Sequence, residues 1–238
     1  PYMLLNYSGR LSDIFTLAHE AGHCLHSYFS DARQTFANSH YPIFLAEIAS
    51  TVNENLLVRH LLDRCDPSTR EGRLQEAYLL NHYIEEFKGT VFRQAMFAEF
   101  EWDCHQHAES GQPLTPDFLC GFYSTLLSQY FGPEVVIDDF MHWEWARIPH
   151  FYNAYYVFKY ATGFSAATAL SRAILEQGAV APYLEFLSAG GSEYPLDTLR
   201  RAGVDMSRPE PVRLALETFS AMVRRFEALM EKEEALGN

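Results

Sequence analysis

The sequence predicts a mainly α protein whose 238 residues form one domain, 1–238. Apolar residues recur every three or four positions through most of the chain, as they do on the buried face of a helix. Strand-like alternation of apolar and polar residues is scarce, and residues 69–110 contain no proline, which would interrupt a helix. A chain of this length can bury one large core.

Charge and composition argue against several classes of partner. The formal net charge is −13, which disfavours nucleic acid because phosphate contacts need a basic face. No apolar run reaches the roughly 18 residues of a membrane-spanning helix, so we expect no membrane partner. The four cysteines are widely spaced and form no C-x-x-C pair, which predicts reduced thiols and a cytoplasmic location. The oligomeric state leaves no signal in the sequence.

The first residues predict an extended segment over 1–9 that ends at Gly9. The chain begins with Pro1 rather than Met, and only 18 residues precede the motif described below. We therefore expect the sequence to be the C-terminal part of a longer protein.

The next segment, residues 12–30, predicts a helix. Ser12 or Asp13 can cap its start, because a short polar side chain accepts bonds from free backbone N–H groups. Its apolar residues predict a buried face: Leu17, Ala18, Ala21, Leu25 and Phe29. Gly22 lies in the interior, where glycine costs about 1 kcal/mol relative to alanine. A packed neighbour, or a substrate that passes close to the backbone, would explain that cost.

This helix carries the pattern H-E-x-x-H in His19, Glu20 and His23. On a helix the two histidines are one turn apart on one face, where their imidazoles can bind one divalent metal ion. Glu20 can reach a water on that ion and act as a general base. The alternative is a pair of core histidines satisfied by hydrogen bonds, with Glu20 at the rim.

A third histidine of the same helix, His26, follows His19 by seven residues and faces the same side. It could serve as another metal ligand. Three histidines of one helix seldom converge on one ion, so we favour a contact to substrate or a second-shell hydrogen bond to a ligand.

Residues 43–63 predict a second helix, and Glu47 stands within its apolar first half. A lone carboxylate there needs a positive partner, which a zinc ion on His19 and His23 would supply. Three protein ligands and a water complete an open catalytic tetrahedron. Glu54 lies on roughly the same face and could hydrogen-bond a ligand histidine, or could simply face solvent. Other first-row divalent ions also fit these ligands.

Residues 64–68 form a turn, and one uninterrupted helix is expected over 69–110. Residues 134–149 form an irregular acidic loop. Further helices are expected over 117–131, 161–178, 181–188, 195–202 and 211–235.

Aromatic residues crowd the segment that begins at Pro149, a proline that suits the entrance of a helix. His150 is followed by four tyrosines, at positions 152, 155, 156 and 160. A hydroxyl or imidazole beside the zinc could stabilise the oxyanion of a tetrahedral intermediate. The alternative is an aromatic core stripe with polar tips.

Three of these motifs together resemble the oligoendopeptidase F type of the thimet oligopeptidase family of zinc metallopeptidases. They are H-E-A-G-H at 19–23, A-E-I-A-S-T at 46–51 and I-P-H-F-Y at 148–152. The resemblance covers nearly the whole chain, as the C-terminal part of the family's catalytic region. It implies a zincin-like helical catalytic domain with one zinc ion per chain. It also implies that a histidine and tyrosines of the third segment stabilise the oxyanion, which favours His150, Tyr152 and Tyr156.

The residues and the resemblance together predict a zinc-dependent metalloendopeptidase that hydrolyses internal bonds of short peptides. Its ligands are His19, His23 and Glu47, and Glu20 activates a zinc-bound water. The family's N-terminal half, which builds the other wall of a deep channel, is absent, so we expect weak activity at most from these 238 residues. Two alternatives stay open: a non-catalytic helical module that holds a structural zinc or none, and another metal hydrolase such as an amidase.

Overall fold

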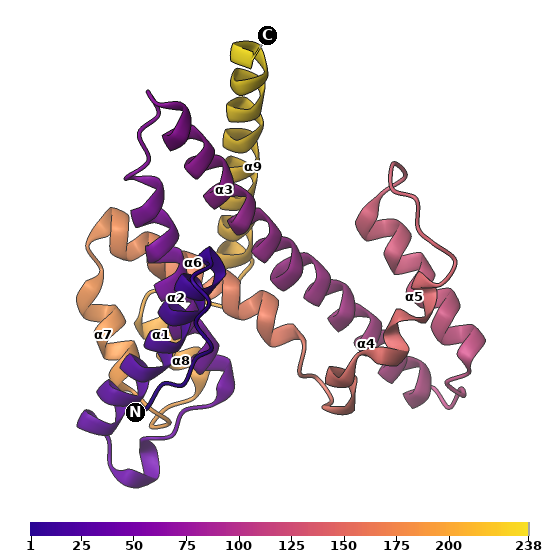
Figure 1. The fold of residues 1–238 in the computed structure, drawn as a ribbon. Helices are drawn as coiled ribbons and strands as arrows, with labels where there is room; N and C mark the ends of the chain where they lie inside the picture. The colour runs from indigo at the N-terminus through magenta and orange to yellow at the C-terminus, as the bar shows by residue number, and fades with distance from the viewer. Residues whose placement is uncertain (238) are drawn as a thin grey trace. The chain divides into compact units, whose positions relative to one another are not determined.

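The computed structural model describes residues 1–237 of the chain, and all of its regular secondary structure there is helical (Figure 1). The prediction of a mainly α fold is therefore confirmed. Contacts group the chain into two compact units, one of residues 1–87 with 162 onward and one of residues 88–161. Among the described residues, no helix is both long enough and apolar enough to cross a membrane.

The first unit is built around α2, which contributes four residues with no exposed surface to the main core. The helices of this unit are α1 (Leu11–Arg33), η1 (Phe36–Asn38), α2 (Ile43–Leu62), α3 (Arg70–Phe87), α7 (Val180–Ser188), α8 (Pro195–Arg201) and α9 (Glu210–Gly237). Most of α6 (Phe158–Gln177) also belongs here. The core side chains are Leu45, Ile48, Ala49 and Val52 of α2, with Ala166, Ala167, Phe186 and Leu199 from other helices.

Gly22 allows α1 and α2 to approach closely. A Cβ atom at this position would lie 2.5 Å from the Cα of Ser50 and 2.8 Å from the carbonyl oxygen of Ala49. No side chain fits in that space, so the expectation of a packed neighbour at Gly22 is confirmed. The neighbour is the backbone of α2, three residues after Glu47.

The start of α1 differs from the prediction by one residue and in its capping. The helix begins at Leu11 after Arg10, so Ser12 does not cap it. Asp13, in the first turn, instead accepts a hydrogen bond from the Arg10 N–H at 2.9 Å. It also accepts bonds from the Ser8 N–H and hydroxyl, each at 2.8 Å. These hydrogen bonds lower the pKa of Asp13, and the bond from Arg10 contributes most.

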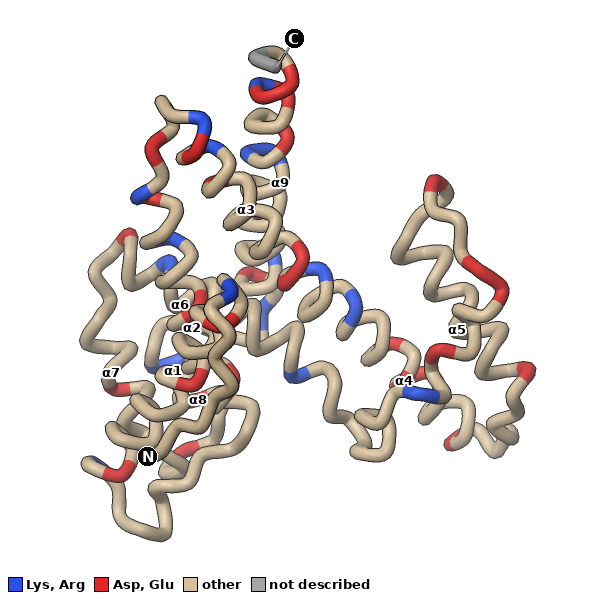
Figure 2. Tube along the Cα trace, in the orientation of Figure 1, with Lys and Arg blue, Asp and Glu red and all other residues tan. Residues whose placement is uncertain are grey.

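Both α3 and α9 carry acidic and basic residues (Figure 2), and some of these pair between the two helices. Arg225 on α9 donates to Glu76 on α3 at 2.6 Å, and Arg73 on α3 pairs with Glu233 on α9. The carboxylates are largely buried, with 10% and 13% of their side chains exposed. These pairs hold α9 against α3.

The single helix expected over 69–110 is instead two helices. A π-helical turn, η2 (Lys88–Phe92), separates α3 from α4 (Arg93–Glu109). It contains Gly89 and the β-branched Thr90 and Val91, which are weak formers of α-helix. The pattern of apolar residues continues through a π turn, and periodicity alone therefore did not reveal it.

The second unit contains η2, α4, α5 (Pro116–Phe131), η3 (Met141–Arg147) and η4 (Pro149–Tyr152). The expected irregular acidic loop contains the 3₁₀ helix η3, whose Glu144 is buried. Glu144 pairs with Arg93 and Arg147 and accepts a bond from the Tyr123 hydroxyl at 2.8 Å. A helix does begin at Pro149, but it is the short 3₁₀ helix η4, and α6 begins only at Phe158.

Candidate metal centre

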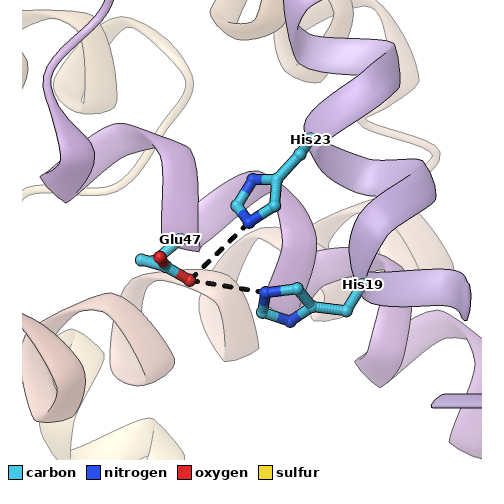
Figure 3. Close-up of side chains that lie close together, drawn as sticks. All are labelled: His19, His23 and Glu47. Atoms are coloured by element: carbon cyan, nitrogen blue, oxygen red, sulfur yellow. Dashed lines mark ion pairs between the residues drawn. The ribbon is translucent and has the colours of Figure 1, made fainter. Parts of the chain in front are cut away.

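His19 and His23 lie one turn apart on α1 and face Glu47 on α2 (Figure 3). The Nε2 atoms of the two histidines are 3.5 Å and 3.9 Å from Oε2 of Glu47. One possible donor atom from each of the three residues lies within 4.8 Å of the others. Each side chain is about 30% exposed (28%, 29% and 32%), so solvent and small ligands can reach the group.

The donor set and its spacing fit a first-row divalent ion. Ligands bonded at about 2.0–2.2 Å in a tetrahedron lie roughly 3.3–3.6 Å apart, close to the separations between Glu47 and the imidazoles. Two imidazoles and a carboxylate are ligands that zinc prefers, although related metals accept the same set.

Glu54 orients one of these histidines. Its Oε1 lies 2.8 Å from Nδ1 of His19, so the other ring nitrogen, Nε2, is directed at Glu47. Burial lowers the pKa of His19, but the hydrogen bond to Glu54 and the charges of Glu54, Glu47 and Glu20 together outweigh burial and raise it. The predicted contact between Glu54 and a histidine of the motif is present.

Glu20 is half-buried beside His19. Among the described residues it forms no hydrogen bond or ion pair, and its charge contributes to the raised pKa of His19. A carboxylate without a partner next to a metal-ligand group can accept a proton from a bound reactant.

Two polar contacts at this site were not found from the sequence. The Asn53 side chain on α2 donates to the Ala18 carbonyl on α1 at 3.2 Å, immediately before His19. The Tyr41 hydroxyl lies 3.5 Å from the His23 carbonyl and 2.8 Å from the Ser27 hydroxyl. Both contacts connect residues far apart in the sequence, which spacing does not reveal.

His26 does not join the group, and its prediction as a ligand or second-shell contact is not supported. Its side chain has no exposed surface, and its ring stacks on Tyr41 at 3.5 Å between centroids and contacts Phe186 at 5.3 Å. Both of its ring nitrogens are buried without a hydrogen-bond partner among the described residues. Burial, with a smaller contribution from His23, lowers the pKa of His26 to about 3. The histidine is a neutral core residue.

The predicted oxyanion residues belong to the second unit, where three aromatic side chains gather. Nε2 of His150 lies 3.4 Å from the Tyr160 hydroxyl, and the His150 ring stacks on Tyr156 at 5.6 Å. Tyr152 stands apart from them, with 89% of its surface exposed, and lines a cavity of about 400 Å³ with Glu101 and Trp145. His150, Tyr156 and Tyr160 thus form one cluster, and Tyr152 does not belong to it.

Comparison with known proteins places the chain in a family. The family model described as Peptidase family M3 matches residues 1–218. The chain is 49% identical over 234 residues to oligopeptidase PepF of Bacillus subtilis, covering 98% of this chain and 34% of that protein. It is 44% identical to the chromosomal oligoendopeptidase F of Lactococcus lactis subsp. cremoris, covering 97% of this chain and 38% of that protein.

A solved structure agrees with these relatives. The crystal structure of oligoendopeptidase-F from Enterococcus faecium superposes with a TM-score of 0.82 at 46% identity, covering 93% of this chain and 40% of that one. The chain therefore spans about a third to two fifths of the length of these relatives. Because the family model matches most of the sequence, the chain belongs to Peptidase family M3.

Proposed function

We propose that this chain is the metal-binding part of a zinc-dependent endopeptidase that hydrolyses internal bonds of short peptides in the cytoplasm. The observation that carries the proposal is the group of His19, His23 and Glu47, with the unpaired Glu20 beside it. Membership of a peptidase family and the names of the relatives support the substrate class.

In the proposed reaction His19, His23 and Glu47 would hold one zinc ion. The bound ion would supply a Lewis acid that polarises the peptide carbonyl and acidifies water. Glu20 accepts a proton from the attacking water as the new C–O bond forms, and later delivers it to the leaving amine as the C–N bond breaks. Glu54 keeps the His19 ring in the orientation that directs Nε2 toward Glu47, where it could serve as a ligand.

The aromatic cluster of the second unit would supply the groups that stabilise the oxyanion. His150, Tyr156 and Tyr160 carry N–H or O–H donors, and such groups stabilise the negative oxygen of a tetrahedral intermediate. The exposed Tyr152 is proposed to contact the peptide rather than the oxyanion.

The metal content of the purified chain tests the site. We expect about one zinc per wild-type chain and much less in Glu47→Ala. Glu185→Ala, which removes an exposed carboxylate from α7 in the same unit, is the matched control and should keep the metal. A wild-type chain that binds no zinc after metal is added would refute the proposed centre.

A second experiment tests the chemistry. Glu20→Ala should keep zinc and lose peptide hydrolysis, since it removes the general base but none of the ligands. Metal-loaded Glu20→Ala with wild-type turnover would contradict the mechanism. Assaying a set of peptides beside small amides distinguishes an endopeptidase from an amidase.

A further inference from the structure

The chain turns sharply at Tyr155, between η4 and α6. Its φ angle is +55°, and it is the only non-glycine residue with positive φ among the described residues. A tyrosine in this left-handed region is unfavourable because its Cβ atom crowds the backbone, so surrounding contacts must hold it there. The turn therefore needs an external restraint.

Three residues of α4 contact Tyr155: Glu101, His105 and Trp102, whose ring lies 6.4 Å from the Tyr155 ring between centroids. The Tyr155 N–H donates to Oε1 of Glu101 at 2.8 Å, and the Tyr155 ring stacks on His105 at 4.6 Å between centroids. Glu101 and His105 are four residues apart, so they lie on one face of the helix. One helix face thus contacts both the backbone and the ring of this residue.

Glu101 is an unusual side chain for this place. It is only 6% exposed, and no Lys or Arg pairs with it within the part of the chain that the structure describes. A buried carboxylate without a cation is costly unless it accepts hydrogen bonds. An apolar residue would pack equally well at this position. We therefore attribute the carboxylate to the hydrogen bond that it accepts from the Tyr155 N–H.

The turn at Tyr155 decides where the next residue lies. Tyr156 follows it directly, and the Tyr156 ring stacks on His150, which also lies 3.4 Å from the Tyr160 hydroxyl. A change of the Tyr155 backbone would rotate Tyr156 away from His150. Glu101 therefore influences the aromatic cluster indirectly, through the backbone of Tyr155, although it does not touch the cluster.

We propose that Glu101 is a positioning residue that holds Tyr155 in its left-handed conformation and so sets the arrangement of His150, Tyr156 and Tyr160. The consequence for catalysis rests on the proposed function of that cluster. The structural part of the proposal does not depend on it.

The test compares two replacements of Glu101 with a control on the same helix. Glu101→Gln keeps an oxygen that can accept the Tyr155 N–H, whereas Glu101→Leu fills similar space without an acceptor. Glu99→Leu is the control, because the Glu99 carboxylate accepts one hydrogen bond from Tyr130 at 3.1 Å and is exposed. It removes the same chemical group without touching Tyr155.

Hydrogen exchange on the metal-loaded protein reports the conformation directly. In Glu101→Leu we expect exchange over residues 153–157 to be about tenfold faster, with α4 itself still protected. Glu101→Gln and Glu99→Leu should stay within about twofold of wild type. Wild-type exchange in Glu101→Leu would overturn the proposal.

Peptide kinetics test the consequence. In Glu101→Leu we expect kcat to fall about ten- to a hundredfold, since misplaced catalytic groups cost this much, with KM and zinc content nearly unchanged. Glu101→Gln should restore the wild-type rate. A loss no larger than that of Glu99→Leu would overturn the catalytic part. If the wild-type chain neither binds zinc nor hydrolyses peptides, the proposed function fails, and hydrogen exchange alone decides the role of Glu101.

Discussion

The histidines of α1 lie in opposite environments. His19 and His23 are 28% and 29% exposed and face the carboxylate of Glu47. One turn further along, His26 has no exposed surface and no hydrogen-bond partner for either ring nitrogen among the described residues. One helix therefore presents two histidines beside a carboxylate, as proposed metal ligands, and a third as a core aromatic residue. The difference comes from what faces the helix: carboxylates of α2 lie against His19 and His23, whereas Tyr41 and Phe186 cover His26.

Replacing one histidine of each environment with phenylalanine should give the largest difference in zinc affinity. His23→Phe removes a proposed ligand and should weaken zinc binding by at least about a hundredfold, more than typical losses from second-shell changes. His26→Phe keeps the stacked aromatic ring and should leave zinc affinity unchanged. Competition with a chelator measures both. Equal affinities of the two variants would remove the distinction.

Gly22 lies between His19 and His23 and sets how closely α2 approaches. Gly22→Ala places a Cβ 2.5 Å from the Cα of Ser50, and the forced separation should cost about 1–3 kcal/mol of unfolding free energy. Gly121→Ala is the control, because that helical glycine of α5 has nothing within 4 Å of its added Cβ. The control should gain up to about 1 kcal/mol from helix propensity. Denaturant unfolding that ranks the variants in the reverse order would contradict the close packing.

The hydrogen bond between Glu54 and His19 should affect zinc binding by the exposed histidines and should have no effect on His26. Glu54→Ala should weaken zinc affinity about ten- to a hundredfold, since the Nδ1 partner that orients His19 is lost. Glu54→Gln keeps an acceptor oxygen and should lose less. Chelator competition is again the measurement, and wild-type affinity in Glu54→Ala would show that the contact does not support a metal ligand.

Acid should lower the stability of the folded chain through the buried His26. The pKa of His26 is lowered to about 3 in the folded chain from an ordinary 6.5, because burial disfavours its charged form. The unfolded chain binds this proton first, so stability falls as pH drops below 6.5, by at most about 1.4 kcal/mol per pH unit. Beside the ring, Tyr41 and His23 are the titratable groups.

Replacing His26 should reduce this acid sensitivity. His26→Phe cannot take up the proton, so its unfolding free energy should fall less than that of wild type between pH 7 and pH 5. Both proteins are compared with metal removed by chelator, which keeps zinc binding out of the measurement. Parallel stability curves for the two proteins would contradict a neutral, buried His26.

Local spacing predicted much of the fold and of the candidate site. The helices around the H-E-x-x-H motif and around Glu47 appear as α1 and α2, within one or two residues of the expected start and end of α2. The later short helices and the last helix appear where their apolar residues recur. Glu54 could be anticipated because it shares a helical face with Glu47.

Other features of the fold depend on which helices pack against each other, and the spacing of residues in the sequence does not reveal this packing. His26 shares the face of His19 by periodicity, yet Tyr41 and Phe186 cover it. The π turn at Lys88–Phe92 keeps an apolar pattern that a continuous helix would also show. The π turn and the cover over His26 were therefore visible only in the structure.

By itself, the sequence determined the helical character of the chain and the pairing of His19 with His23, because both follow from intervals of three and four residues on a helix. The sequence also predicted Glu47 and Glu54 beside those histidines. The tertiary structure decided how closely α2 approaches α1 at Gly22 and which nitrogen of His19 faces each carboxylate. It also decided that His26 is a core residue and that Glu101 holds the turn at Tyr155, 54 residues away. The burial of His26 and the hydrogen bond between Glu101 and Tyr155 arise only when segments far apart in the sequence pack together, and this is why no local pattern could report them.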